Sequence, residues 1–287
     1  MRALVGVVCV ICSTSLWSPA AAQQIPFAQR QFNEMSLRPF GQPVIPVFDG
    51  WYPNEDGTFS LCFGYFNLNT AQAFDVPLGP ENVIEPAEFD GDQPTHFDPV
   101  PDPTLTQKYR HHWCVFTVRV PADFGDNKLV WSITTQGEAL SVPGHLIPAY
   151  VLDERTSPGR DAVAPVLRFA AGGPAGQGRN GLRGAPRSVA VGEPLELTAW
   201  VEHAEPGTWL GWTKHRGPGD VVFSAPEVVV ADPRGRGTTV GRFSEPGEYV
   251  LRVQAINDPG PRNPTGGFEF HCCWTNGYVT VVVTGGP

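Results

Sequence analysis

The stretch FSEPGEYVLRVQA (Phe243–Ala255) is the clearest pointer to the fold class of this chain. The Pro246–Gly247 pair predicts a turn, and Tyr249 then opens a run of β-favouring residues that is typical of a strand. Such turn residues recur throughout, because the 287 residues include 32 Gly and 30 Pro. We find no long stretch that combines apolar residues at helical spacing with helix-forming residues, so the sequence predicts an all-β protein.

Strands of the same kind surround this stretch in the second half of the chain. In SVAVGEPLELTAWVEH, which we interpret as a strand pair, the apolar residues alternate as they do in a strand: Leu195, Leu197, Ala199 and Val201. The following TWLGWTKHRGPGDVVFSAP contains Trp212, which we expect in the core of a central strand, and GYVTVVVT ends the series. Short alternating runs separated by Gly and Pro predict a β-sandwich over residues 187–287.

The order of these motifs also resembles a known group of domains. VGEPLEL, WTKHRGPGDVVF, FSEPGEYVLRVQA and the terminal VTVVV are similar to the PKD group of bacterial extracellular immunoglobulin-like domains, over about the last third of the chain. The resemblance implies a sandwich that serves as a spacer or binding module on exported proteins, with Tyr249 as its corner tyrosine. EHAEPGT stands where the group often carries an acidic loop, so cation binding at that place is not implied.

The first half carries a second set of alternating runs. GTFSLCFGYFNLN places one set of side chains on one face, Phe59, Leu61, Phe63 and Tyr65, with Cys62 on the other face. WCVFTVRVP places Cys114 together with Phe116, and VIPVF, KLVWSITTQG and HLIPAYVL supply further strands. We therefore expect a first β-sandwich over residues 23–155. It resembles uncharacterised exported β-sandwich proteins, a likeness that implies no activity.

Turns and loops separate the strands of this first half. Turns are predicted at Asn54–Gly57 and Asp123–Asn127. Between them lies GPENVIEPAEFDGDQPTHFDPVPDPT, which we interpret as one long acidic loop, too polar and proline-rich for the core. Residues 156–186 then form a Gly/Pro-rich linker, in which Val163–Phe169 is a candidate first strand of the second domain. The GGPAGQGRNG segment that follows predicts a flexible loop and some hinge motion, unless a cross-domain disulfide prevents it.

The first residues, MRALVGVVCVICSTSLWSPAAAQQ, have the layout of a cleaved export signal, with a basic start, an apolar run and small residues up to Ala22. Residues 1–22 are therefore predicted to be a signal peptide, and the mature chain to be periplasmic or at the cell surface. A membrane anchor is disfavoured because the apolar run is shorter than the ~20 residues of a span. Lipoprotein processing at Cys9 or Cys12 is disfavoured by the bulky residue before each.

The charge distribution bears on the partner. Residues 23–155 hold 17 Asp and Glu against 7 Lys and Arg, while residues 156–287 hold 12 of each kind. A nucleic-acid partner is disfavoured, because binding phosphates requires a basic face. The acidic first half suits a cation or a basic partner, or is simply a solvated surface.

Export changes how the cysteines are interpreted. Cys9 and Cys12 fall in the signal, which leaves Cys62, Cys114, Cys272 and Cys273. An even number in an oxidising compartment favours disulfides, and pairing within domains joins Cys62 to Cys114. A free buried pair is the alternative. For the adjacent Cys272 and Cys273 we rank three interpretations. A vicinal or interdomain disulfide comes first, free thiols come second, and a soft metal bound together with His271 comes third.

Several side chains of the first half are candidate metal ligands. His96 lies in the acidic loop, and His111 and His112 open the strand that contains Cys114. Imidazole next to carboxylate suits zinc or copper, although adjacent histidines on a strand point to opposite faces. Asp90 and Asp92, on either side of Gly91, are candidates for part of a calcium loop. The alternative is that these are surface residues.

The segment before the last strand is long. A strand that ends near Asp258 and a final strand that starts near Tyr278 leave DPGPRNPTGGFEFHCCWTNG as an extended connection, with a hairpin turn at Asn276–Gly277. Its candidate binding residues are Phe268, Phe270, His271 and Trp274, whose aromatic faces suit a sugar or a peptide side chain. The alternative is that the aromatic residues cover an open edge of the sandwich.

No catalytic signature is present: we find no G-x-S-x-G, no H-E-x-x-H and no P-loop. The sequence thus predicts an exported, non-catalytic binding or structural protein that recognises a protein or glycan through loops, without a cofactor. One alternative is a periplasmic metal-binding or redox protein using the His and Cys clusters. Another is a carbohydrate-active enzyme using the acidic loop. Neither the partner's identity nor the oligomeric state follows from a motif.

Overall fold

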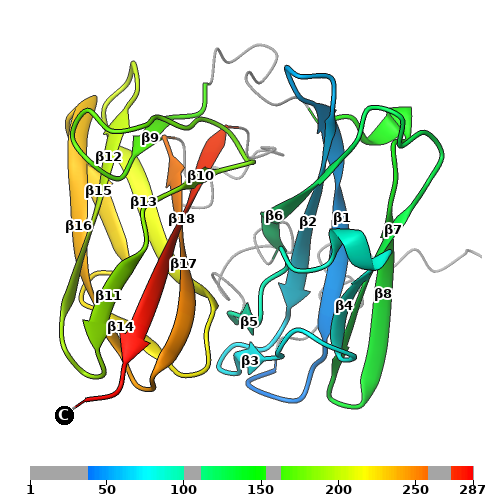
Figure 1. Ribbon diagram of the computed structural model, residues 1–287, viewed down its shortest axis with the longest axis horizontal. Coiled ribbons are helices and arrows are strands. Elements are labelled where there is room, and N and C mark those ends of the chain that lie inside the picture. The colour runs from blue at the N-terminus through cyan, green and yellow to red at the C-terminus, as the bar shows by residue number, and fades with distance from the viewer. Residues whose placement is uncertain (1–37, 100–110, 153–162, 258–272, 287) are drawn as a thin grey trace, which may run out of the picture. The chain divides into compact units, whose positions relative to one another are not determined.

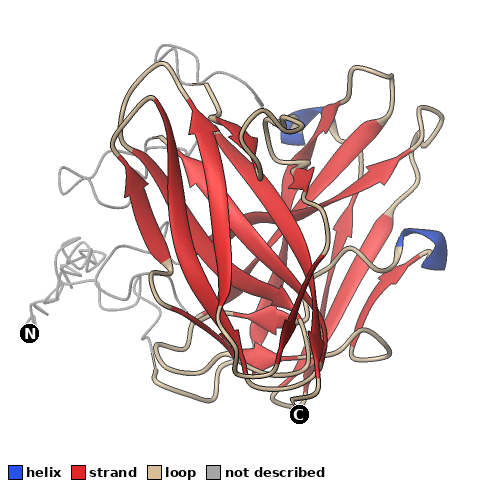
Figure 2. Ribbon diagram, turned by 60° about the vertical axis from the view of Figure 1, so that its left-hand side comes forward, coloured by secondary structure: helices blue, strands red, loops and turns tan. Residues whose placement is uncertain are grey.

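The computed structural model describes residues 38–99, 111–152, 163–257 and 273–286. Contacts divide the chain into residues 1–36 and residues 37–287, and every described residue belongs to the second unit. Strands dominate this unit, and its helical turns are the short η3 (Ala87–Phe89) and η5 (Pro148–Tyr150) (Figure 2). In the ranges described, no helix has both the length and the apolar character needed to cross a membrane.

The first β-sandwich is built from two three-stranded sheets, β1-β2-β6 and β4-β7-β8, with a small β3-β5 ribbon (Figure 1). Its strands are β1 (Val44–Pro53), β2 (Phe59–Asn67), β3 (Phe74–Asp75), β4 (Asn82–Glu85), β5 (His96–Phe97), β6 (His111–Val120), β7 (Leu129–Thr135) and β8 (Glu138–Gly144). The predicted alternation in β2 is confirmed, because Leu61, Phe63 and Tyr65 lie in one hydrophobic core. Trp131 of β7 is fully buried in the same core, with its ring edge-on to Phe116 at 5.0 Å.

The second β-sandwich pairs the sheet β10-β18-β17-β13-β15 with the sheet β14-β16-β12-β9, and β11 joins the edge of the first sheet along β18 (Figure 1). Its strands are β9 (Val166–Arg168), β10 (Leu182–Arg183), β11 (Arg187–Ala190), β12 (Leu195–Glu202), β13 (Thr208–Arg216), β14 (Val221–Phe223), β15 (Glu227–Val230), β16 (Arg234–Phe243), β17 (Gly247–Ile256) and β18 (Trp274–Thr284). The core contains the four alternating residues of β12 and also Trp212, as the sequence predicts.

Tyr249 forms the corner expected of an immunoglobulin-like sandwich. Its hydroxyl donates to the Glu245 carbonyl at 2.9 Å and accepts from the Gly219 amide at 3.0 Å, while its ring is fully buried. A tyrosine that hydrogen-bonds a few residues upstream at the start of the next-to-last strand is a hallmark of these folds. The chain is therefore all-β, with two β-sandwiches of which the second is immunoglobulin-like.

Four local predictions in this part of the chain are wrong. HLIPAYVL contains the turn η5 rather than a strand, and β8 closes the sheet in its place. The acidic stretch is not one loop, because it contains β4, η3 and β5 and fully buries Asn82 and Gln93. The strand β11 pairs in parallel with β18 and not with β12. Asn276–Gly277 is no turn: both residues lie inside β18, where Asn276 pairs with Gln254 of β17.

Within the Val163–Phe169 segment of the linker, β9 (Val166–Arg168) pairs antiparallel with β12. The glycine-rich segment after it is held by specific contacts. Gly176 exchanges backbone hydrogen bonds with Leu167, and the Gly178 amide donates to the Thr275 hydroxyl at 3.0 Å. Arg179, next along the chain, is 1% exposed. The flexible loop expected from the composition is thus replaced by a packed one.

A third hydrophobic cluster joins the two sandwiches. Tyr52, the disulfide cysteines Cys62 and Cys114, and Leu152 pack with Ile256 and Trp274 of the second sandwich. This explains why β2 is buried on both faces: one face covers the core of its own sandwich, and the other meets β17 and β18. We call the region where the two sandwiches meet the junction.

Candidate functional site

Two irregularities in the first sheet direct unusual side chains into the junction. The register of β1 against β2 shifts between Phe48 and Gly50, which places Asp49 in a bulge. The register of β2 against β6 shifts between Phe63 and Tyr65, and Cys114 in the bulged part of β6 has a φ of 40°. β-Bulges re-aim side chains and are common next to functional sites.

The prediction that Cys114 shares a face with Phe116 is therefore wrong, because the bulge turns it to the opposite face.

Cys62 and Cys114 form a disulfide, with Cα atoms 5.2 Å apart. Asp49 lies beside it, and one of its carboxylate oxygens accepts from the Cys114 amide at 2.7 Å. The His111 imidazole Nε2 is 3.2 Å from the other oxygen. We call Asp49, Cys62, Cys114 and His111 the Asp49 cluster.

The Asp49 cluster is shielded from water, and this decides its charge. Burial raises the pKa of Asp49 to about 8, against the lowering influence of the Cys114 amide and of Arg179. Burial also lowers the pKa of His111 to about 3, and the neighbouring His112 adds to that effect. Both pKa shifts, upward for Asp49 and downward for His111, favour the uncharged side chain at neutral pH, as expected where no water solvates a charge.

Asn276 is the hydrogen-bonding centre of the junction. Its amide nitrogen donates to the carbonyls of Cys114 at 3.2 Å and Arg179 at 3.0 Å. Its amide oxygen accepts from Nε and Nη2 of Arg252 at 3.1 and 2.9 Å. On the same strand, the Tyr278 hydroxyl donates to the Val115 carbonyl at 2.9 Å. One strand of the second sandwich thereby satisfies the bulged backbone of β6.

His96 sits in an ionic group at the edge of the same junction. Its ring nitrogens contact Asp75 at 2.9 Å and Asp98 at 3.2 Å, and Lys214 of β13 reaches the same Asp75 oxygen at 2.7 Å. Burial alone would lower the pKa of His96, but the hydrogen bonds to the two carboxylates outweigh it and raise the pKa to about 9. His96 is thus a charged partner for two carboxylates.

The other predicted metal ligands have separate partners. The His112 Nε2 lies 2.9 Å from the Pro99 carbonyl, and the ring stacks on Tyr65. Asp90 accepts from the Ile84 amide and from Gln93 Nε2, while Asp92 accepts from Arg183 at 3.0 Å. Across the described ranges, the structure does not gather these residues with His96 and His111 around one point. The group that does bring potential ligand atoms together, all within 4.8 Å, is Asp49, Cys62 and Cys114.

Part of the predicted binding segment can be placed. Trp274 lies in β18 rather than in a loop, because this strand begins four residues earlier than expected, and its ring is buried beneath the Arg179 guanidinium at 4.6 Å. Cys273 is disulfide-bonded and has a φ of 87°. Phe268, Phe270, His271 and Cys272 lie outside the described residues.

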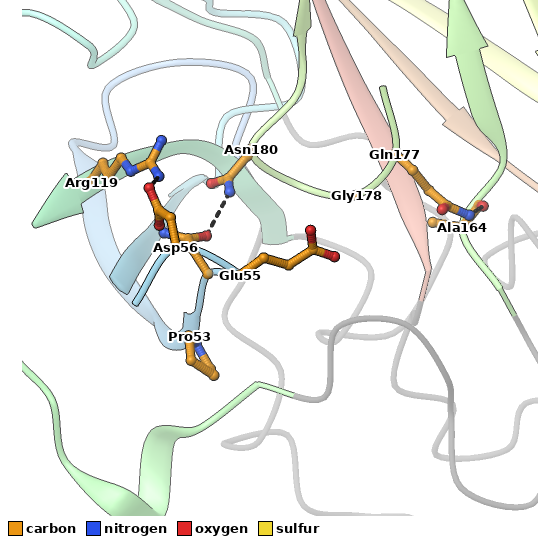
Figure 3. A pocket seen from close by; sticks show the side chains of 9 residues that line it. Pro53, Glu55, Asp56, Arg119, Ala164, Gln177, Gly178 and Asn180 are labelled. Carbon is orange, nitrogen blue, oxygen red and sulfur yellow. Dashed lines mark hydrogen bonds and ion pairs between the residues drawn. The ribbon is translucent and has the colours of Figure 1, made fainter. Parts of the chain in front are cut away.

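A polar cavity of about 360 Å³ opens beside the junction. It is lined by the turn after β1, by Arg119, and by the glycine-rich segment with Gln177 and Asn180. In Figure 3, Asp56, Arg119 and Asn180 lie on one side, with Gln177 and Ala164 opposite. A hydrogen bond of 2.9 Å from Asn180 to Asn54 ties the two segments together.

Hydrogen bonds fix the orientation of the amides in this cavity. The Asn180 oxygen accepts from the Tyr52 hydroxyl at 2.8 Å and from Thr117 at 3.2 Å. The Asn54 amide donates to Thr58 at 2.9 Å, and Arg119 forms an ion pair with Asp56. The polar wall of the cavity is therefore held by hydrogen bonds and an ion pair within the protein, and such preorganisation lowers the entropic cost of binding in general.

Sequence reasoning missed Asp49, Arg179, Arg252 and Asn276. A signal was available for two of them, since Asp49 and Arg252 are charged residues inside otherwise apolar strand runs. Such residues are rarely buried unless they are paired, so they point to a polar contact. Arg179 and Asn276 stand in Gly-rich or turn-like contexts that favour a loop, and no local pattern identifies them.

The chain matches no protein-family model and no curated protein. Among solved structures it is similar to the D00-D0 domain of intimin, at 14% identity over 84% of this chain and 100% of that chain, with a TM-score of 0.26. It is also similar to tandem Ig domains of titin, at 10% identity over 85% and 100%, with a TM-score of 0.23. Fibronectin(III)-like modules of Clostridium thermocellum CbhA match at 10% over 84% and 95%, with a TM-score of 0.23. TM-scores this low carry no argument about function.

Proposed function

We propose that the chain is an exported, non-catalytic binding protein whose second sandwich is PKD-like and whose polar cavity recognises a glycan. The observation that carries the proposal is the preorganised polar wall of the cavity, in which Asn180 is fixed by hydrogen bonds to Tyr52 and Asn54. Ligand sites commonly use a few precisely oriented polar groups to select their ligand.

The chemistry of the lining supports a ligand rich in hydroxyl groups. Asn54, Gln177 and Asn180 supply amides, Glu55 and Asp56 supply carboxylates, and Arg119 supplies a guanidinium. Amides and hydroxyls both donate and accept hydrogen bonds, so neighbouring hydroxyls of a sugar find partners of either kind on such a wall.

The junction supports a binding role over a catalytic one. Two junction histidines whose pKa values are strongly shifted, His96 and His111, contact carboxylates or aromatic rings inside the protein. A general acid or base must reach the proton it transfers. A pair of sandwiches held together by buried hydrogen bonds is also a stable platform on which a cavity keeps its shape.

The proposal is tested with a glycan array on the full mature chain, followed by calorimetric titration of the glycan that binds best. We expect Glu55→Gln and Gln177→Ala each to weaken binding tenfold or more, because both residues line the cavity. Glu138→Gln is the matched control, since Glu138 is exposed on β8 away from the cavity lining, and it should leave the affinity unchanged.

Three outcomes would contradict the proposal. Absence of binding to every glycan rejects the ligand class. Binding that is unaffected by both cavity variants places the ligand elsewhere. If chromatography after the titration detects cleavage products of the bound glycan, the protein is a carbohydrate-active enzyme and the non-catalytic assignment is wrong.

A second candidate function, a metal-binding or redox protein, is favoured by one observation. The carboxylate of Asp49 and the sulfurs of Cys62 and Cys114 lie within 4.8 Å of one another. Calorimetric titration of the full chain with zinc, before and after reduction, tests this candidate. Absence of zinc binding in both states would reject it.

A further inference from the structure

The Asp49 cluster has the composition of a metal site whose sulfurs are joined to each other. The bulges of β1 and β6 place one carboxylate and two sulfurs within 4.8 Å, and these atoms come from three neighbouring strands. Such convergence from separate strands fixes the relative positions of the ligand atoms before an ion binds.

His111 is not among the three residues whose ligand atoms lie within 4.8 Å of one another, but it adjoins their carboxylate. Its Nε2 is 3.2 Å from Asp49 Oδ1, a separation that suits an oxygen and a nitrogen bound to one zinc at about 2.0–2.1 Å each. Within the described part of the chain, neither of these two buried atoms has a hydrogen-bond partner. A buried donor or acceptor without a partner is costly, so this unsatisfied pair, whose carboxylate adjoins two sulfurs, requires an explanation.

The local backbone is shaped to leave room for these groups. A Cβ on Gly64 would lie 2.5 Å from Asp49 Oδ2 and 2.9 Å from His111 Nε2. A Cβ at this position would also clash with the His112 carbonyl, so β2 needs glycine beside β6 and beside these two side chains.

We propose that, when the Cys62–Cys114 disulfide is reduced, the chain binds one zinc ion through Cys62, Cys114, Asp49 and His111. A dithiol or phosphine reductant supplies two electrons, and two protons complete the two thiols as the sulfur–sulfur bond breaks. Zinc then displaces the protons of both thiols and of Asp49 to solvent, while neutral His111 binds through Nε2. Two sulfurs, one nitrogen and one oxygen form a tetrahedral set of the kind that zinc accepts.

The surroundings balance the charge of the loaded site. Zinc with two thiolates and one carboxylate carries a net charge of −1. Arg179 is buried close enough to Asp49 to stabilise its charge, and its guanidinium stacks on Trp274 at 4.6 Å. A buried charge needs such a partner, and Arg179 supplies it. A two-electron oxidant of the disulfide class, accepting the electrons of both thiolates, would re-form the Cys62–Cys114 bond and release the ion to solvent.

The test uses the full chain carrying Cys272→Ser and Cys273→Ser, so that the only remaining mature cysteines are Cys62 and Cys114. After anaerobic reduction with a phosphine, cobalt is added and then displaced by zinc. We expect thiolate-to-cobalt charge-transfer and tetrahedral d–d bands in the reduced protein, with one zinc per chain at displacement. The oxidised protein should show neither. Asp49→Asn and His111→Gln should each weaken cobalt binding about 10–100-fold or more, whereas His112→Gln should not.

A second readout covers the case in which the reduced protein or a variant unfolds. Zinc should raise the melting temperature of the reduced protein, or restore its folded circular dichroism spectrum, and should leave the oxidised protein unchanged. Absence of both the bands and the zinc-dependent stabilisation would overturn the proposal. Bands of unchanged intensity and affinity in both Asp49→Asn and His111→Gln would also overturn it.

Discussion

Replacing Asn276 by alanine should destabilise the protein by much more than an average substitution. Asn276 is fully buried, and its side chain makes four hydrogen bonds that hold Cys114, Arg179 and Arg252. Two accept from a charged guanidinium, and such bonds contribute about 1.5–3 kcal/mol each, against about 0.5–1.5 kcal/mol for each neutral bond. The values are not additive, and Arg252 keeps its hydrogen bond to Tyr278. We therefore expect a loss of about 4 kcal/mol, near the cost of breaking a buried ion pair.

Urea unfolding followed by tryptophan fluorescence measures this loss as a lower midpoint at unchanged slope. The matched control is Val282→Ala on the same strand, where the side chain is 41% exposed and the expected change is below about 0.5 kcal/mol. The double variant Asn276→Leu with Arg252→Met leaves the Cys114 and Arg179 carbonyls unpaired, as Asn276→Ala does, but it leaves no buried guanidinium without its acceptor, so it should cost less than Asn276→Ala. A loss of under about 1 kcal/mol for Asn276→Ala would refute the reasoning that this residue holds the junction.

Three further predictions follow from the same contacts. The pKa of His96 is raised from 6.5 to about 9 in the folded protein, so its contribution to the free energy of unfolding is fully present below pH 6.5 and is lost as the pH rises through 9. His96→Gln should therefore flatten the fall in unfolding free energy between pH 6.5 and 9. An equally steep fall in the variant would contradict the assignment. The double variant Cys62→Ser with Cys114→Ser should lower the free energy of unfolding in urea by about 4 kcal/mol. This value follows from the loop-closure entropy at a sequence separation of 52. A melting temperature equal to that of the native chain would reject the disulfide as a stabilising bond. Tyr249→Phe should cost about 1–3 kcal/mol by calorimetry, because the Gly219 amide and Glu245 carbonyl lose their buried partner; no loss would mean that the corner hydroxyl is not needed.

The sequence predicts the fold class because it depends on local periodicity. Alternation in β2 and β12 identifies their core faces, and the turn before Tyr249 locates the corner. Both signals come from residues adjacent in the chain, so neither requires knowledge of the partner strand.

The junction could not be predicted in the same way. Cys114 faces the junction because it lies in a bulge of β6, and a bulge re-aims a side chain without a strong sequence signal. Asn276–Gly277 is a strong turn signal, yet Asn276 is kept in a strand by hydrogen bonds to Arg252 and Arg179, which are distant in sequence. Long-range polar contacts of this kind override local propensity.

The most direct test of this account is native-state hydrogen exchange at the Thr95 amide, which donates across the junction to the His215 carbonyl at 2.9 Å. If the two sandwiches are held together as one cooperative unit, this amide should exchange with the same free energy as the core amides of β2 and β17, because it opens only when the protein unfolds. Rapid exchange at Thr95 while those core amides stay protected would show that the junction opens by itself, and would contradict the central claim.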